Sequence, residues 1–178
     1  MGTGFDVASA AEIEQYIGYG ADPNNMIYAN PIKQEDHILL AKKYGVKKMT
    51  FDSVEELYKI KKSFPEAECV IRIATDYQGG SAKYELSSKF GVFMEDIPLI
   101  LETGKKLNLK IIGASFHVGS GGVLYEEYEQ CLKDVRKIFD MAVEHGLPRM
   151  DFLDIGGGWT YILPGSGKNF DEVAPIVG

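Results

Sequence analysis

The chain has 178 residues, 45% of them hydrophobic and 25% charged, which is enough apolar material for one core. Its net charge of −7 is unlike that of a nucleic-acid-binding surface, and we expect no membrane contact, because neither a leader nor an apolar run of about 20 residues is present. Cys69 and Cys131 fit neither a disulfide framework nor a metal-ligand spacing, so we expect reduced thiols, a cytoplasmic location and no bound metal.

The first part of the chain alternates short apolar segments with amphipathic segments. Strands are predicted at 4–8, 26–30, 48–51 and 69–73, and helices are predicted to begin at Ser9, Gln34 and Ser53. The stretches Ser9 to Glu12 and Ser53 to Glu56 are typical of capping boxes, in which a serine and a glutamate satisfy backbone N–H groups at a helix start. The strands recur every 21 or 22 residues, which indicates a regular β–α repeat.

The second part of the chain carries two glycine-rich loops, each directly after a predicted strand. One strand runs from Ile111 to His117 and leads into Gly119, Ser120 and Gly121. The other begins at Phe152 and leads into Gly156, Gly157 and Gly158, and helices are expected at 95–107 and 124–145. Two such loops favour a single anion, a phosphate, bound between them by backbone N–H groups.

About six parallel strands with intervening helices form either an open doubly wound sheet or a (β/α)8 barrel. The barrel is favoured because polar residues follow almost every strand, and a barrel gathers its C-terminal strand ends around one mouth. These residues are Ser9, Asn30, Asp52, Arg72 with Asp76, His117, and Gly156 to Gly158. Six strands and 178 residues fall short of the roughly 250 residues of a full barrel, so we expect a partial barrel, about strands two to seven, as one incomplete domain over 1–178.

Seven segments, in order and with matching spacing, resemble the ornithine decarboxylase family of fold-type III pyridoxal-phosphate enzymes. Any one of them would be weak, whereas seven in order are specific. They are Gly4 to Ser9, Ile27 to Pro31, Met49 to Ser53, Arg72 to Asp76, Ser88 to Gly91, Ser115 to Gly121 and Leu153 to Gly158. The resemblance implies an alanine-racemase-like barrel that binds pyridoxal 5'-phosphate.

The resemblance also implies roles for particular residues. His117 matches the family histidine that stacks on the cofactor ring, and Ser120 and Gly158 match phosphate contacts. Gly156, Gly157, Asp6 and Arg72 match residues that line the cofactor site. Turn geometry alone is the alternative for the two glycines, and a buried structural ion pair is the alternative for Asp6 with Arg72.

Other parts of the family pattern are not found in this sequence. They are the cofactor lysine of the first barrel strand, the Glu-Pro-Gly-Arg motif of the eighth, and a C-terminal β domain with its catalytic cysteine. Lys33 follows a similar Tyr-Ala-Asn segment, but it lies beyond Pro31 and two residues too late, so it is not assigned as the cofactor lysine.

The resemblance implies decarboxylation of L-ornithine to putrescine by a homodimeric lyase of polyamine biosynthesis. We expect this chain to be inactive alone. One alternative is a non-catalytic relative that binds a regulatory protein. Another is a decarboxylase for a different basic amino acid, namely diaminopimelate, arginine or lysine.

Overall fold

The computed structural model describes residues 3–75, 90–119 and 125–157, without the side chains of 125 and 126. Its six strands form one parallel sheet in the order β1-β2-β3-β4-β5-β6, the order of the sequence. The strands are β1 (Phe5–Val7), β2 (Met26–Tyr28), β3 (Lys48–Phe51), β4 (Glu68–Arg72), β5 (Lys110–Ser115) and β6 (Phe152–Asp154). Sequential order is that of a barrel, because a doubly wound sheet reverses its strand order at a switch point.

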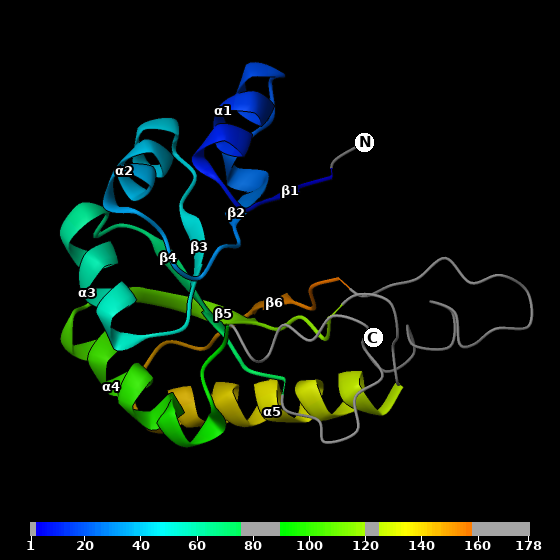
Figure 1. Cartoon of the computed structure of the whole chain (residues 1–178). Helices are drawn as coiled ribbons and strands as arrows, with labels where there is room; N and C mark the ends of the chain where they lie inside the picture. Colours follow the sequence, from blue (N-terminus) through cyan, green and yellow to red (C-terminus); the bar gives the residue numbers. More distant parts are fainter. Residues whose placement is uncertain (1–2, 76–89, 120–124, 158–178) are drawn as a thin grey trace, which may run out of the picture.

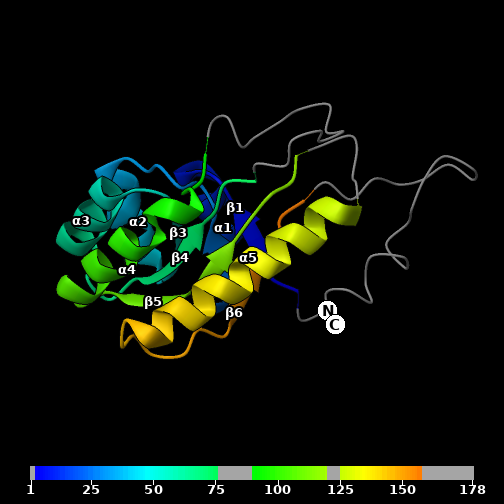
Figure 2. The ribbon, with the colours of Figure 1, turned by 90° about the horizontal axis from the view of Figure 1, so that it is seen from below.

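The sheet curls, and its helices lie in an arc along the outer side (Figure 1). The α-helices are α1 (Ala10–Gly18), α2 (Glu35–Tyr44), α3 (Val54–Ser63), α4 (Ile97–Lys106) and α5 (Tyr125–Glu144). Two short 3-10 helices, η1 (Pro23–Asn25) and η2 (Met94–Asp96), complete the described elements. Figure 2, at right angles to the first view, shows α5 running along the sheet beside β5 and β6. No helix within the described ranges is both long and apolar enough to span a membrane.

The predicted partial barrel is confirmed: six parallel strands form a curled part of a barrel, with β1 and β6 as the two edges. The strand positions agree with the sequence to within two residues. The main difference is at β5, which ends at Ser115 rather than at His117, so that the histidine lies on the loop that follows the strand.

The predicted start of α1 is also confirmed. The Ser9 hydroxyl accepts a hydrogen bond from the Glu12 N–H at 3.2 Å, and the Glu12 carboxylate accepts one from the Ala8 N–H. The carboxylate thus reaches one residue further back than in a strict capping box.

The second predicted capping box forms only in half. Ser53 caps α3 by accepting a hydrogen bond from the Glu56 N–H at 3.3 Å. The Glu56 carboxylate does not return to Ser53; it binds the ammonium groups of Lys33 and Lys59 instead. The prediction of a reciprocal box was therefore wrong at Glu56, because a buried cation competes for its carboxylate.

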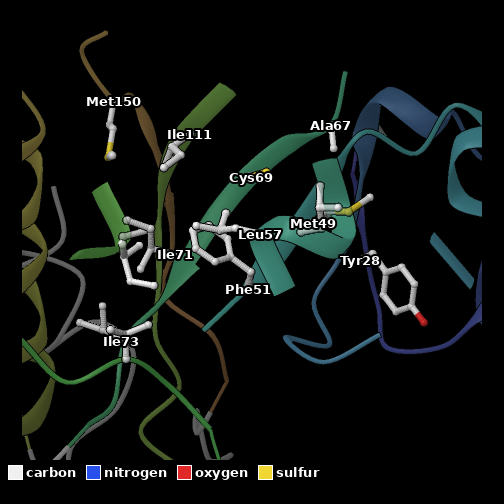
Figure 3. Close-up of a cluster of buried hydrophobic side chains, with 14 of the residues drawn as sticks. Tyr28, Met49, Phe51, Leu57, Ala67, Cys69, Ile71, Ile73, Ile111 and Met150 are labelled. Carbon is white, nitrogen blue, oxygen red and sulfur yellow. The ribbon is translucent and has the colours of Figure 1, made fainter. Parts of the chain in front are cut away.

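The hydrophobic core lies between the outer face of the sheet and the helices (Figure 3). On β4, Cys69 and Ile71 are fully buried in this layer, beside Leu57 of α3 and Met49 of β3. Both predicted free thiols, Cys69 and Cys131, are buried and form no disulfide. Because alternate residues of a strand face opposite sides, the core fixes which residues face the interior of the barrel.

Candidate functional site

One row of polar side chains crosses the C-terminal ends of three adjacent strands. Arg72 of β4 is in register with Ser115 of β5, and Ser115 is in register with Asp154 of β6. Paired residues of neighbouring strands face the same side of a sheet, so these three side chains share the barrel interior. The row arises because each of these three strands ends in a polar or charged residue.

A small cavity of about 30 Å³ lies at this mouth, roughly the volume of one water molecule. It brings together Asp6, Arg72, His117 and Gly156, four of the seven residues predicted as site residues. Gly157 adjoins it beside the His117 ring, whereas Ser120 and Gly158 lie outside the described residues. The remaining lining residues are Ala29, Thr50, Ser115, Phe116 and Asp154.

Hydrogen bonds hold His117 on both its ring and its backbone. The Gly119 N–H donates to the ring Nδ1 at 2.9 Å, and the Thr75 hydroxyl donates to the His117 carbonyl oxygen at 3.3 Å. Because Nδ1 accepts, the neutral ring carries its proton on Nε2. Burial lowers the pKa of His117, and the nearby Arg72 lowers it further against the opposing charge of Asp154. A neutral, oriented imidazole suits contact with the face of an aromatic ligand better than contact with an anion.

The two glycines after β6 lie close to the loop that follows β5, and at Gly156 the approach excludes a side chain. Gly156 has a φ of +62°, and a Cβ there would overlap the carbonyl oxygen of Phe116. Its N–H donates to the Asp154 carboxylate at 2.8 Å. A Cβ on Gly157 would lie 3.0 Å from His117 Nε2. The turn geometry that requires glycine is confirmed for Gly156 only, and contact with a cofactor stays a prediction for both glycines.

Among the described residues, the carboxylates of Asp6, Asp52 and Asp154 lie near the guanidinium of Arg72 at the mouth. Burial lowers the pKa of Arg72, opposed by the nearby carboxylates of Asp52, Asp154 and Asp6. Partial burial raises the pKa of Asp6, and Asp154 raises it further against the opposing charge of Arg72. Within the described residues none of these carboxylates forms a direct ion pair with Arg72, which lies 5.2 Å from the Phe90 ring. Its charge thus acts on several nearby carboxylates without being held by one of them at ion-pair distance.

Sequence reasoning missed several residues of the site, among them Asp154 and Tyr128. Asp154 contributes a carboxylate to the mouth and also accepts the Phe116 N–H on its backbone oxygen at 3.0 Å. Its position as the last strand residue before the glycines could have indicated this. Tyr128 of α5 donates its hydroxyl to the Gly157 carbonyl oxygen at 2.9 Å and packs edge-on against Phe116. Nothing in the helical pattern distinguishes it from an ordinary core residue.

The side chains at the mouth offer groups that suit a polar ligand with an aromatic ring. The Ser115 hydroxyl is buried and has no hydrogen-bond partner in the described part of the chain, which indicates a missing polar partner. His117 offers a ring face, Arg72 a positive charge, and the glycines a close backbone approach. The chemistry of these groups, rather than the volume of the cavity, suits pyridoxal phosphate. Across residues 3–75, 90–119 and 125–157, no His, Cys, Asp or Glu side chains group as a metal site.

The sequence matches the family model described as pyridoxal-dependent decarboxylase, pyridoxal binding domain, over residues 1–174. The chain is 45% identical over 180 residues to ornithine decarboxylase of Rattus norvegicus, and 44% identical over 180 residues to antizyme inhibitor 2 of Xenopus laevis. Each alignment covers 99% of this chain and 38% of the relative. The fold is similar to the crystal structure of the Paramecium bursaria Chlorella virus arginine decarboxylase, with a TM-score of 0.90, 35% identity, and coverage of 99% of this chain and 47% of that one.

Proposed function

Because the chain belongs to the pyridoxal-dependent decarboxylases through its pyridoxal-binding domain, we propose that it forms the cofactor-binding part of an ornithine decarboxylase. The reaction is the conversion of L-ornithine to putrescine and carbon dioxide. The observation that carries the proposal is the mouth itself, where His117, Arg72 and the glycine loop after β6 surround one cavity.

Pyridoxal phosphate, when bound, supplies an electron sink for the loss of carbon dioxide. The chain's own residues would bind and orient it. The neutral His117 ring would hold one face of the pyridine ring, and the Gly119 and Thr75 hydrogen bonds would fix the orientation of that imidazole. Arg72 would offset negative charge at the mouth, while Ser120 and Gly158 would contact the phosphate.

The chain spans 38% of the length of the two curated relatives compared above. Two further strands between β1 and β6 would close an eight-stranded barrel, and the relatives' greater length supports a further domain in the whole enzyme. A homodimer and a cytoplasmic location belong to the same proposal, and the two buried free thiols are consistent with a reducing compartment.

A second candidate is a non-catalytic protein that binds a regulatory partner. The similarity to antizyme inhibitor 2 favours it, because that relative is almost as similar as the ornithine decarboxylase of Rattus norvegicus. Decarboxylation of arginine or another basic amino acid is the third, and the structural similarity to an arginine decarboxylase favours that one. The three candidates differ in the product that each would release.

An amine-product assay separates them. The whole protein that the gene encodes, rather than the 178-residue chain by itself, is supplied with pyridoxal phosphate. Four amino acids are then tested in turn: L-ornithine, L-lysine, L-arginine and diaminopimelate. Putrescine from ornithine as the dominant product, lost in His117→Ala, supports the proposal. Agmatine, cadaverine or lysine as the dominant product would contradict the substrate. No amine from any of the four amino acids would favour the non-catalytic protein.

The 178-residue chain, expressed by itself, is expected to release no putrescine. Among the described residues that line the cavity there is no lysine, and the family's chemistry requires one that bonds to the cofactor. Putrescine above a no-protein control, abolished by His117→Ala, would contradict this expectation.

A further inference from the structure

Lys33 is a buried lysine for which the proposed chemistry has no use. Its side chain is 0% exposed, and it follows Pro31 in the loop between β2 and α2. The ammonium group donates to the backbone oxygens of Thr50 at 2.6 Å, Asn30 at 3.1 Å and Pro31 at 3.4 Å. A buried ammonium group stays charged only where protein groups replace the hydrogen bonds it would make to water, and these three carbonyl oxygens do so.

Helix α3 holds Lys33 from the other side. The Glu56 carboxylate lies 2.8 Å from the Lys33 ammonium, and its same oxygen accepts the Lys33 backbone N–H at 3.2 Å. Lys59, one turn further along α3, binds the second Glu56 oxygen and the Lys33 carbonyl oxygen. Both the backbone and the side chain of Lys33 are thus fixed to one helix.

The ammonium lies where the β2–β3 ladder ends. Only two register pairs join these strands, Ile27 with Lys48 and Tyr28 with Met49, the smallest number between any two neighbours in the described sheet. Just beyond this point, Ala29 and Thr50 line the mouth cavity. Lys33 binds the Thr50 carbonyl oxygen of β3 and the Asn30 carbonyl oxygen of the segment that follows β2.

We propose that Lys33 is a positioning residue: beyond the last register pair of β2 with β3, it ties Thr50 of β3 to the segment that follows β2, and so fixes the width of the cofactor mouth between Ala29 and Thr50. This inference rests on the proposed function, since it takes the mouth as the binding site of pyridoxal phosphate. Lys33 touches neither the cavity nor the cofactor directly; it acts through the backbone of Thr50 and Asn30.

The test uses the gene product and a pair of variants. Lys33→Met alone leaves Glu56 buried with only the partly exposed Lys59 as partner, so it is expected to lower stability. The double variant Lys33→Met with Glu56→Leu removes both buried charges, an exchange that often preserves folding, yet it still removes the donor that ties the strand ends. The matched control is Lys62→Met, which breaks an exposed ion pair between α3 and Glu35 of α2.

Two measurements on folded protein decide the outcome. The double variant is expected to bind pyridoxal phosphate about tenfold or more weakly, since small displacements of a site are costly, while Lys62→Met is unchanged. Amide hydrogen exchange is expected to rise in residues 26–33 and 48–52 and not across the rest of the sheet. A purely structural role would raise exchange throughout and leave the affinity of the remaining folded protein intact.

The inference is overturned if the folded double variant binds the cofactor as tightly as the wild type, or if exchange at the two strand ends is unchanged. If the wild type itself fails to bind pyridoxal phosphate, the proposed function fails. In that event the inferred role in cofactor binding fails with it, and hydrogen exchange still decides whether Lys33 ties the strand ends.

Discussion

His117 and Gly157 meet across the mouth of the half-barrel: the ring Nε2 lies 3.0 Å from the position that a Cβ on residue 157 would occupy. The imidazole is held from its other side by the Gly119 N–H. A side chain at position 157 would crowd the imidazole, whereas glycine leaves room for it. The two glycine-rich loops meet at this contact.

Gly157→Ala is expected to displace the His117 ring by a few tenths of an ångström and to weaken pyridoxal phosphate binding by about tenfold. The control is Gly18→Ala at the end of α1, where an added Cβ meets no atom within 4 Å. Equilibrium binding with both variants tests this. Equal affinity for the wild type and Gly157→Ala, in folded protein, would show that ring placement does not depend on this contact.

The lowered pKa of His117 predicts how stability depends on pH. Above about pH 6.5, the pKa of histidine in an unfolded chain, the ring is neutral in both the folded and the unfolded protein and does not change the free energy of unfolding. As the pH falls through that value towards the lowered folded pKa, the unfolded chain takes up the proton first, so the folded state loses stability. Melting temperatures of the wild type should thus fall more between about pH 7.5 and pH 5 than those of His117→Gln. Parallel curves for the two proteins would exclude a lowered pKa.

Tyr128→Phe tests the bond from α5 to the glycine loop. The variant keeps the edge-on contact with Phe116 but removes the hydroxyl that donates to the Gly157 carbonyl oxygen. Loss of one hydrogen bond should lower the free energy of unfolding by about 1 kcal/mol. Denaturant titration against Tyr58→Phe, a tyrosine of α3 that is 48% exposed, measures the difference. No loss relative to that control would mean that the bond contributes nothing to stability.

Much of the fold could be predicted because it depends on patterns between residues that are close together in the sequence. The 21- and 22-residue repeat and the serine caps are short-range features, and they located β1 to β4 and the start of α1 correctly. Glu56 could not be predicted, because its choice between Ser53 and Lys33 depends on a residue 23 positions away.

The site was predicted in the same uneven way. His117 and Arg72 stand at strand ends, where a barrel places its chemistry, and the structure brings both to one cavity. Tyr128 was missed because its role depends on the tertiary contact of its hydroxyl with Gly157, and a helical stripe of apolar residues contains no sign of that. The loop position of Lys33, on which its exclusion as the cofactor lysine rested, could be read from the sequence, whereas its burial beside Glu56 needed the structure.

The exposed edges predict self-association. Within the described residues, β1 and β6 each pair with one neighbouring strand only. Closing the barrel without two further strands would mean bridging a gap about 10–15 Å wide between these edges. Unpaired edges recruit other strands, so the isolated 178-residue chain should associate or aggregate. Sedimentation of the purified chain over a range of roughly a hundredfold in concentration tests this. A compact monomer that melts cooperatively throughout would mean that the edges are closed in solution.

Amide hydrogen exchange with and without pyridoxal phosphate tests the central claim most directly, because it locates the ligand on the chain. We predict slower exchange at residues 115–121 and 154–158, whose described parts, 115–119 and 154–157, meet at the mouth. We predict no change around Arg136, Asp140 and Arg149, which line a separate surface groove. Ser120→Ala should reduce the protection. Protection of the groove in place of the mouth, or none at saturating ligand, would contradict the assignment of this site to the cofactor.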